Sequence, residues 1–220
     1  MISILNEYIK NHQISMKQSR NGIYQYYGIP YPIMRDMAKS IIKSNPKTIF
    51  EELDPTIYEH LILYTMVLRG VKDISIGLTL FDRFLSFAKD WSTVDSLCQN
   101  FVVTKEHLEI VWNFLMTLLK VDNEFVQRVV AVMILTYFIN DQYIDRLFGV
   151  LDQLTHQGYY TKMGVAWAVA TIASKYPSKV IDYLHKGSLD IWTHNKAIQK
   201  AKESFRVEDS VKEKLHLLKR

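Results

Sequence analysis

A tryptophan and an aspartate lie four residues apart in the segment KDWSTVDSLC, residues 89–98. On a helix, Trp91 and Asp95 would share one face. A carboxylate beside an indole suits a cation, because the ring face and the negative charge both attract it. The alternative is that Trp91 packs in a core while Asp95 caps a helix or pairs with a surface base. The pair is thus a candidate for stabilising positive charge.

Two further side chains are candidates for binding. Arg128 lies near the edge of an apolar stripe. Its guanidinium could form a fixed fork for a phosphate or for a carboxylate such as Asp95, or it could extend along the surface into solvent. Trp167 follows the small residues of KMGVA, which would let another helix approach closely. It is either part of a binding surface or plain core, whereas Trp112 and Trp192 fall on apolar stripes and are predicted to be core.

Several familiar catalytic signatures are absent from the sequence. It contains no glycine-rich phosphate loop, no G-x-S-x-G and no H-E-x-x-H, and its seven histidines show no metal-ligand spacing. The single cysteine, Cys98, excludes an internal disulfide and is expected to be a small buried apolar residue. We therefore predict neither a metal nor a cofactor.

The composition is that of a globular protein, with 48% apolar and 23% charged residues. No apolar run approaches the roughly 20 residues that span a bilayer, so no membrane partner is expected. The first residues include Glu7 and lack a secretion-signal pattern. These features favour a soluble protein in a reducing compartment such as the cytoplasm.

The formal charge of +4 is unevenly distributed. Residues 1–50 carry a net +5, residues 51–185 a net −5, and residues 186–220 a net +4. Basic segments at both ends of the chain suggest a polyanionic partner.

The elements that must position these residues are predicted to be helices. None of the five prolines lies between Pro55 and Pro177, so strand-and-turn structure is disfavoured there. Apolar residues recur at helical spacing from Val126 to Tyr137, after a candidate N-cap at Asp122-Asn123. Another stripe begins at Leu108, with Thr104 as its candidate cap, and a break is expected at Asn140-Asp141.

Helix-break-helix units recur from Thr104 to Tyr176 about every 35–40 residues, which is the spacing of helical repeats. We predict an all-α, HEAT-like solenoid of about a dozen helices, curved so that its basic ends flank a concave groove. The prediction is a single domain over 1–220. It divides into a basic, irregular helical segment (1–50), helix pairs (51–205) and a C-terminal helix or tail (206–220).

Five segments together resemble AlkD-type DNA glycosylases, the HEAT-like repeat proteins of DNA alkylation repair. They are Tyr27-Gly28-Ile29-Pro30 with Arg35, Trp91–Asp95, Phe125–Arg128, Thr161–Trp167 and Asn195–Lys200. The order and spacing of the segments match that family, and the resemblance covers about residues 20–205. Each motif alone is weak, and four in register are fairly specific.

The resemblance implies a function. Members of the family bind duplex DNA on a basic concave face and excise cationic N3- and N7-alkylated purines. By position, Asp95 would be the catalytic carboxylate, and Trp91 and Trp167 would line the site. Arg128 would hold the DNA backbone or orient Asp95. Lysines are further candidate DNA contacts, namely Lys162, Lys196 and Lys200. The expected partner is duplex DNA, bound by a monomer.

The sequence also departs from the active relatives. The segment before Gly28 is shorter, Ser19 falls near an expected aromatic DNA contact, and Ala170 falls where relatives often carry a basic residue. A non-excising nucleic-acid-binding paralogue is therefore an alternative. A second alternative is a helical scaffold for an acidic protein.

Overall fold

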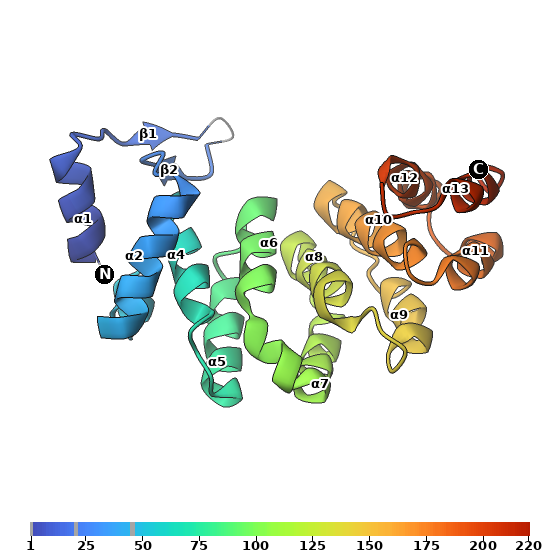
Figure 1. The fold of residues 1–220 in the computed structure, drawn as a ribbon, viewed down its shortest axis with the longest axis horizontal. Coiled ribbons are helices and arrows are strands. Elements are labelled where there is room, and N and C mark those ends of the chain that lie inside the picture. The colour runs from blue at the N-terminus through green and yellow to red at the C-terminus, as the bar shows by residue number, and fades with distance from the viewer. Residues whose placement is uncertain (1, 20–21, 45–46) are drawn as a thin grey trace. The chain divides into compact units, whose positions relative to one another are not determined.

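The computed structural model describes residues 2–19, 22–44 and 47–220, and these residues are mostly helical (Figure 1). They form thirteen α-helices, one 3-10 helix, one π-helix and two strands of two residues each. The prediction of an all-α fold is confirmed. The chain divides into two compact units, Met1–His107 (unit 1) and Leu108–Arg220 (unit 2). The single domain and its concave groove stay predictions.

Unit 1 contains seven helical elements and a short hairpin among the described residues. In chain order they are α1 (Ile2–Asn11), β1 (Lys17–Gln18), β2 (Gln25–Tyr26), α2 (Tyr31–Ser44), α3 (Lys47–Glu51), α4 (Tyr58–Leu68), α5 (Ile74–Leu85), α6 (Trp91–Asn100) and the 3-10 helix η1 (Val102–Glu106).

Helix α4 lies at the centre of unit 1, where it packs against α2 and α6, with α3 and α5 also in contact. Its residues 61–64 are fully buried, so the helix is enclosed on all sides. β1 and β2 pair antiparallel, and β2 is attached to the loop before α4 by a hydrogen bond of 2.8 Å from Gln25 N to Thr56 O. The hairpin was not predicted, because two-residue strands leave no alternating pattern.

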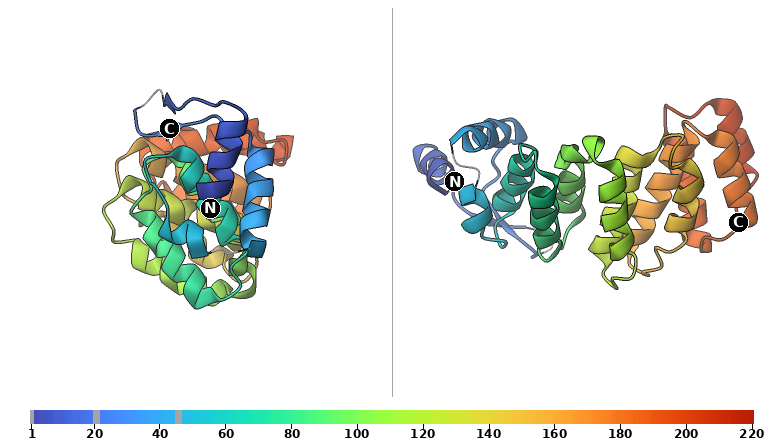
Figure 2. Two further views of the ribbon diagram at one scale, coloured as in Figure 1. Left: turned by 90° about the vertical axis from the view of Figure 1, so that its left-hand side faces the viewer. Right: turned by 90° about the horizontal axis from the view of Figure 1, so that it is seen from below.

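Unit 2 continues the pattern of paired helices (Figure 2). Its elements are α7 (Leu108–Leu118), α8 (Glu124–Met133), the π-helix η2 (Ile134–Phe138), α9 (Ile144–Leu151), α10 (Tyr159–Ala173), α11 (Pro177–Lys186), α12 (Ile191–Glu203) and α13 (Asp209–His216). Helix α10 packs between α8 and α12, while α7, α11 and α13 contact α8, α10 and α12 respectively. Helices α8, α10 and α12 start 35 and 32 residues apart, near the predicted repeat length.

Two of the three helix boundaries predicted from local signals around unit 2 are confirmed. Asn123 caps α8 as predicted, with its Oδ1 accepting from Phe125 N at 2.9 Å and Val126 N at 3.2 Å. The break at Asn140 is confirmed, since η2 ends at Phe138 and α9 begins at Ile144. The prediction that Thr104 caps the helix beginning at Leu108 is wrong. Thr104 lies inside η1, and its hydroxyl donates to Phe101 O instead.

Candidate nucleic-acid interface

Trp91 and Asp95 lie one turn apart on α6, as the sequence predicted. Asp90 caps this helix, since its carboxylate accepts from Ser92 N at 2.8 Å and from the Ser92 hydroxyl. Trp91 is 49% exposed, which rules out the core alternative for it. Asp95 is only 8% exposed, so its carboxylate is held in a largely desolvated environment.

Polar contacts with α4 fix the position of α6. The Ser92 and Tyr58 hydroxyl oxygens lie 3.2 Å apart, and burial raises the pKa of Tyr58 well above its ordinary value of 10. One turn further on, the Ser96 and Thr65 hydroxyls lie 2.6 Å apart. These contacts at two successive turns fix the part of α6 that carries Asp95 relative to α4.

Arg128 is buried, with 4% of its surface exposed, so the alternative of an arginine extending into solvent is wrong. Its Nη1 donates to the carbonyl oxygen of Tyr160 at 3.1 Å, which joins α8 to the start of α10. Gly164 permits this approach, because a Cβ there would lie 3.3 Å from the Ala131 Cβ and 3.5 Å from the Arg128 Cγ. The expectation that small residues near Trp167 admit another helix is therefore confirmed.

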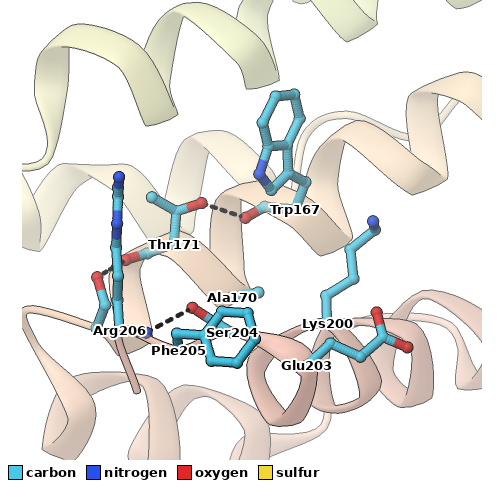
Figure 3. Close-up of a pocket in the computed structure, with 9 residues that line it drawn as sticks. Trp167, Ala170, Thr171, Lys200, Glu203, Ser204, Phe205 and Arg206 are labelled. Carbon is cyan, nitrogen blue, oxygen red and sulfur yellow. Dashed lines mark hydrogen bonds between the residues drawn. The ribbon is translucent and has the colours of Figure 1, made fainter.

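Trp167 and Lys200 border one hollow of about 370 Å³ in unit 2 (Figure 3). Trp167 comes from α10 and Lys200 from α12. The chain after α12 adds Phe205, which is fully exposed, and Arg206. Sequence reasoning missed these last two residues, because they follow the final helical stripe. Among the described residues, neither the Lys200 ammonium nor the Arg206 guanidinium has a hydrogen-bond or ion-pair partner.

The other two predicted lysines lie elsewhere in unit 2. Lys162 pairs with Asp190, the N-cap of α12, with 3.7 Å between Nζ and Oδ1. Burial raises the pKa of Asp190, but hydrogen bonds from Thr193 and the charge of Lys162 outweigh it and leave the pKa below 3.8. Lys196 donates to Gln199 at 2.7 Å and lies 5.7 Å from the ring of Trp192.

Of the two tryptophans predicted to lie in the core, Trp112 is buried and Trp192 is not. Trp112 is 2% exposed and packs against Phe138 and Tyr143, with ring centroids 5.3 and 5.0 Å apart. Trp192 is 39% exposed, so its core assignment was wrong. It is the second residue of α12, at the start of the helix, where the Tyr159 ring of α10 covers it only in part.

A further carboxylate, which sequence reasoning did not single out, supports the first family-like motif. Glu59 is 1% exposed and accepts hydrogen bonds from the backbone N–H groups of Tyr27, Gly28 and Ile29. The Glu59 carboxylate therefore holds the backbone of residues 27–29 in place just before α2.

The predicted site residues belong to different units. Trp91 and Asp95 are in unit 1, while Arg128, Trp167, Lys162, Lys196 and Lys200 are in unit 2. Their convergence on one surface stays a prediction. No group of three or more metal-ligating side chains occurs among the described residues, and Cys98 is buried as expected. No helix in the described part of the chain is long and apolar enough to cross a membrane.

Helices that pack in successive pairs within both units define an all-α protein with the organisation expected of helical repeats. Residues 6–205 match the family model described as DNA alkylation repair enzyme, so the chain belongs to that family. No curated protein matches the chain closely enough to add a relative. Membership of this family indicates DNA as a partner.

Proposed function

We propose that this protein is a DNA N-glycosylase that hydrolyses the N-glycosidic bond of cationic N3- and N7-alkylated purines in duplex DNA. The observation that carries the proposal is Asp95. It is a nearly buried carboxylate one turn from an exposed tryptophan, on a helix held by polar contacts, in a chain of the DNA alkylation repair enzyme family.

The chemistry suits this set of residues. An alkylated purine that already carries a positive charge leaves as a neutral base, so no general acid is needed. As the bond from the sugar C1′ to nitrogen breaks, its electron pair goes to the base and positive charge develops on the sugar. A carboxylate at Asp95 stabilises that charge and orients the water whose oxygen attacks C1′. The proton released by the water passes to solvent.

The remaining residues would bind DNA. The faces of Trp91 and Trp167 favour the cationic lesion and developing sugar cation. The Lys200 ammonium, which has no partner among the described residues, suits a phosphate, with Lys162 and Lys196 as further contacts to the DNA backbone. Arg128, whose guanidinium also donates to the carbonyl oxygen of Tyr160, would hold the DNA backbone near the lesion or orient Asp95. We expect a monomer that acts in the cytoplasm, on the nucleoid if the source is bacterial.

A base-release assay on methylated duplex DNA tests the proposal. The wild-type chain should release 3- or 7-methylpurine, and Asp95→Asn should reduce the rate by about 100-fold or more, since the amide carries no charge. Asp82→Asn removes an exposed carboxylate of α5 and serves as the matched control. Full activity in Asp95→Asn would remove Asp95 from the mechanism.

A second candidate is a nucleic-acid-binding protein without excision. It is favoured by Ala170, which is 4% exposed and forms part of the hollow where relatives often carry a basic residue. In that case the wild-type chain would release no base, yet its affinity for duplex DNA would still fall steeply with salt. If no nucleic acid binds even at low salt, a scaffold for an acidic protein is the remaining explanation.

A further inference from the structure

A row of aromatic rings runs across the first turns of α8, α10 and α12. The ring centroids of Phe125 and Tyr160 are 5.4 Å apart, those of Tyr160 and Tyr159 are 5.2 Å apart, and those of Tyr159 and Trp192 are 5.6 Å apart. All three distances lie in the range of favourable aromatic contacts. The row therefore connects rings contributed by α8, α10 and α12, which pack side by side.

The end of the row is open to solvent. Tyr159 is 55% exposed and Trp192 is 39% exposed, although large aromatic side chains usually gain free energy from burial. Both side chains are held in place. The two rings meet edge to face, and the Lys196 ammonium lies 5.7 Å from the Trp192 ring centroid. The structure thus presents two positioned aromatic side chains to solvent, which suits stacking with a ligand.

Trp192 also borders a hollow of about 830 Å³ between α12 and α13. Its charged lining residues are three lysines, one histidine and one glutamate, namely Lys196, Lys202, Lys219, His216 and Glu203. The formal charge is therefore positive even with the histidine neutral. This hollow is distinct from the one beside Trp167, although Glu203 borders both.

The positive charge of this hollow is not cancelled internally. Glu203 accepts a hydrogen bond of 2.8 Å from Gln199, not from a lysine. The Lys202 Nζ lies 3.4 Å from the His216 Nδ1. In the described part of the chain, the Lys219 ammonium has no hydrogen-bond or ion-pair partner. An anion is thus the complementary ligand for this end of unit 2.

We infer that Tyr159, Trp192 and the basic hollow between α12 and α13 form a binding site for single-stranded nucleic acid. Unpaired bases can stack on the two rings while the adjoining phosphates approach Lys202 and Lys219. A continuous duplex would not use this site fully, because its base faces are covered by neighbouring pairs. An acidic peptide would use the lysines but would leave the aromatic row without a role. The inference requires binding alone and is independent of base excision.

Fluorescence anisotropy with a labelled eight-nucleotide oligo(dT) and the full chain tests the inference. The wild-type chain should bind it at low salt. Trp192→Leu and Tyr159→Leu should each weaken binding by about fivefold or more, because each removes a stacking surface. Trp192→Phe keeps a ring and should recover most of the affinity. Tyr31→Leu, at a tyrosine of unit 1 that is 43% exposed, is the matched control and should change nothing.

The lysines give a second, independent readout. Lys219→Gln should reduce the slope of log affinity against log salt by about 0.7, the value for one phosphate of a single strand. Lys179→Gln removes a lysine of α11 that is already paired with Asp145, and should leave the slope unchanged. Circular dichroism of each variant checks that its helices are intact.

Three results would overturn the inference. The first is no binding of oligo(dT) at low salt. The second is oligonucleotide binding that is insensitive to both aromatic substitutions. The third is equal competition by poly-glutamate with no effect of Trp192→Leu, which would assign the surface to an acidic protein. Base release from duplex DNA is measured separately with Asp95→Asn, so failure of one proposal does not imply failure of the other.

Discussion

The carboxylate of Glu59 holds the backbone of Gly28, with 2.7 Å between Oε1 and the backbone nitrogen. Glu59 is the second residue of α4, and Gly28 precedes α2 with a φ of +80°, a conformation that favours glycine. The same carboxylate also accepts from Tyr27 N and Ile29 N. One buried acid therefore fixes how α2 begins beside the central helix of unit 1.

Replacing Glu59 should destabilise unit 1. Glu59→Ala leaves three backbone donors without their acceptor, and we expect the free energy of unfolding to fall by about 3 kcal/mol. Urea unfolding followed by circular dichroism measures the change. Glu51→Ala removes an exposed glutamate of α3 and should change stability by less than about 0.5 kcal/mol. Equal losses in both variants would contradict a specific role for Glu59.

His60 should make stability depend on pH. Burial lowers its pKa below 6.5, although the charges of Asp54 and Glu59 oppose this, and its Nδ1 accepts from Asp54 N at 3.1 Å. Above about pH 6.5 the ring is neutral in both states, and its stabilising contact is fully present. As the pH falls from there through the folded pKa, the unfolded chain binds the proton first, so stability is lost.

The measurement is the urea midpoint between pH 7.5 and pH 5. His60→Asn keeps an acceptor but cannot titrate, and should flatten the decline. His185→Asn changes an exposed histidine of α11 and should leave the decline as it is. An unchanged pH profile in His60→Asn would show that other groups cause it.

A side chain at Gly158 should destabilise unit 2. An added Cβ would overlap the Oε1 of Glu124, the atom that accepts a hydrogen bond from Tyr160 N. Gly158→Ala must displace that carboxylate, and we expect a loss of about 1–2 kcal/mol in urea unfolding. Gly149→Ala is the control, because a Cβ there meets no described atom within 4 Å and the change favours the helix. A neutral Gly158→Ala would mean that the hydrogen bond contributes nothing.

Lys200 and Lys162 should differ in their effects on DNA binding. Lys200→Gln removes an ammonium without a partner among the described residues, so the salt slope for duplex binding should fall by about 0.9 with no change in stability. Lys162→Gln also removes the ion pair with Asp190 at the start of α12. That variant should lose some stability as well as affinity. Identical behaviour of the two variants, measured by anisotropy and urea unfolding, would contradict this distinction.

The sequence by itself determined that the chain is all-α and where some of its helices begin. Asn123 caps α8 because its own side chain can reach the first free N–H groups, and Trp112 is core because its stripe continues through a whole helix. Both signals are local: they depend on residue type and spacing within one or two turns. The pairing of Trp91 with Asp95 on one face was predictable for the same reason.

Only the tertiary structure decided which side chains meet across helices. Glu59 reaches Gly28 from 31 residues away, and Phe205 and Arg206 join Trp167 although no helical stripe includes them. Trp192 lies on an apolar stripe yet remains exposed, because burial depends on whether a neighbouring element covers the end of α12. Periodicity indicates which face of a helix is apolar. What packs on that face is set by contacts between residues distant in sequence, which local periodicity does not reveal.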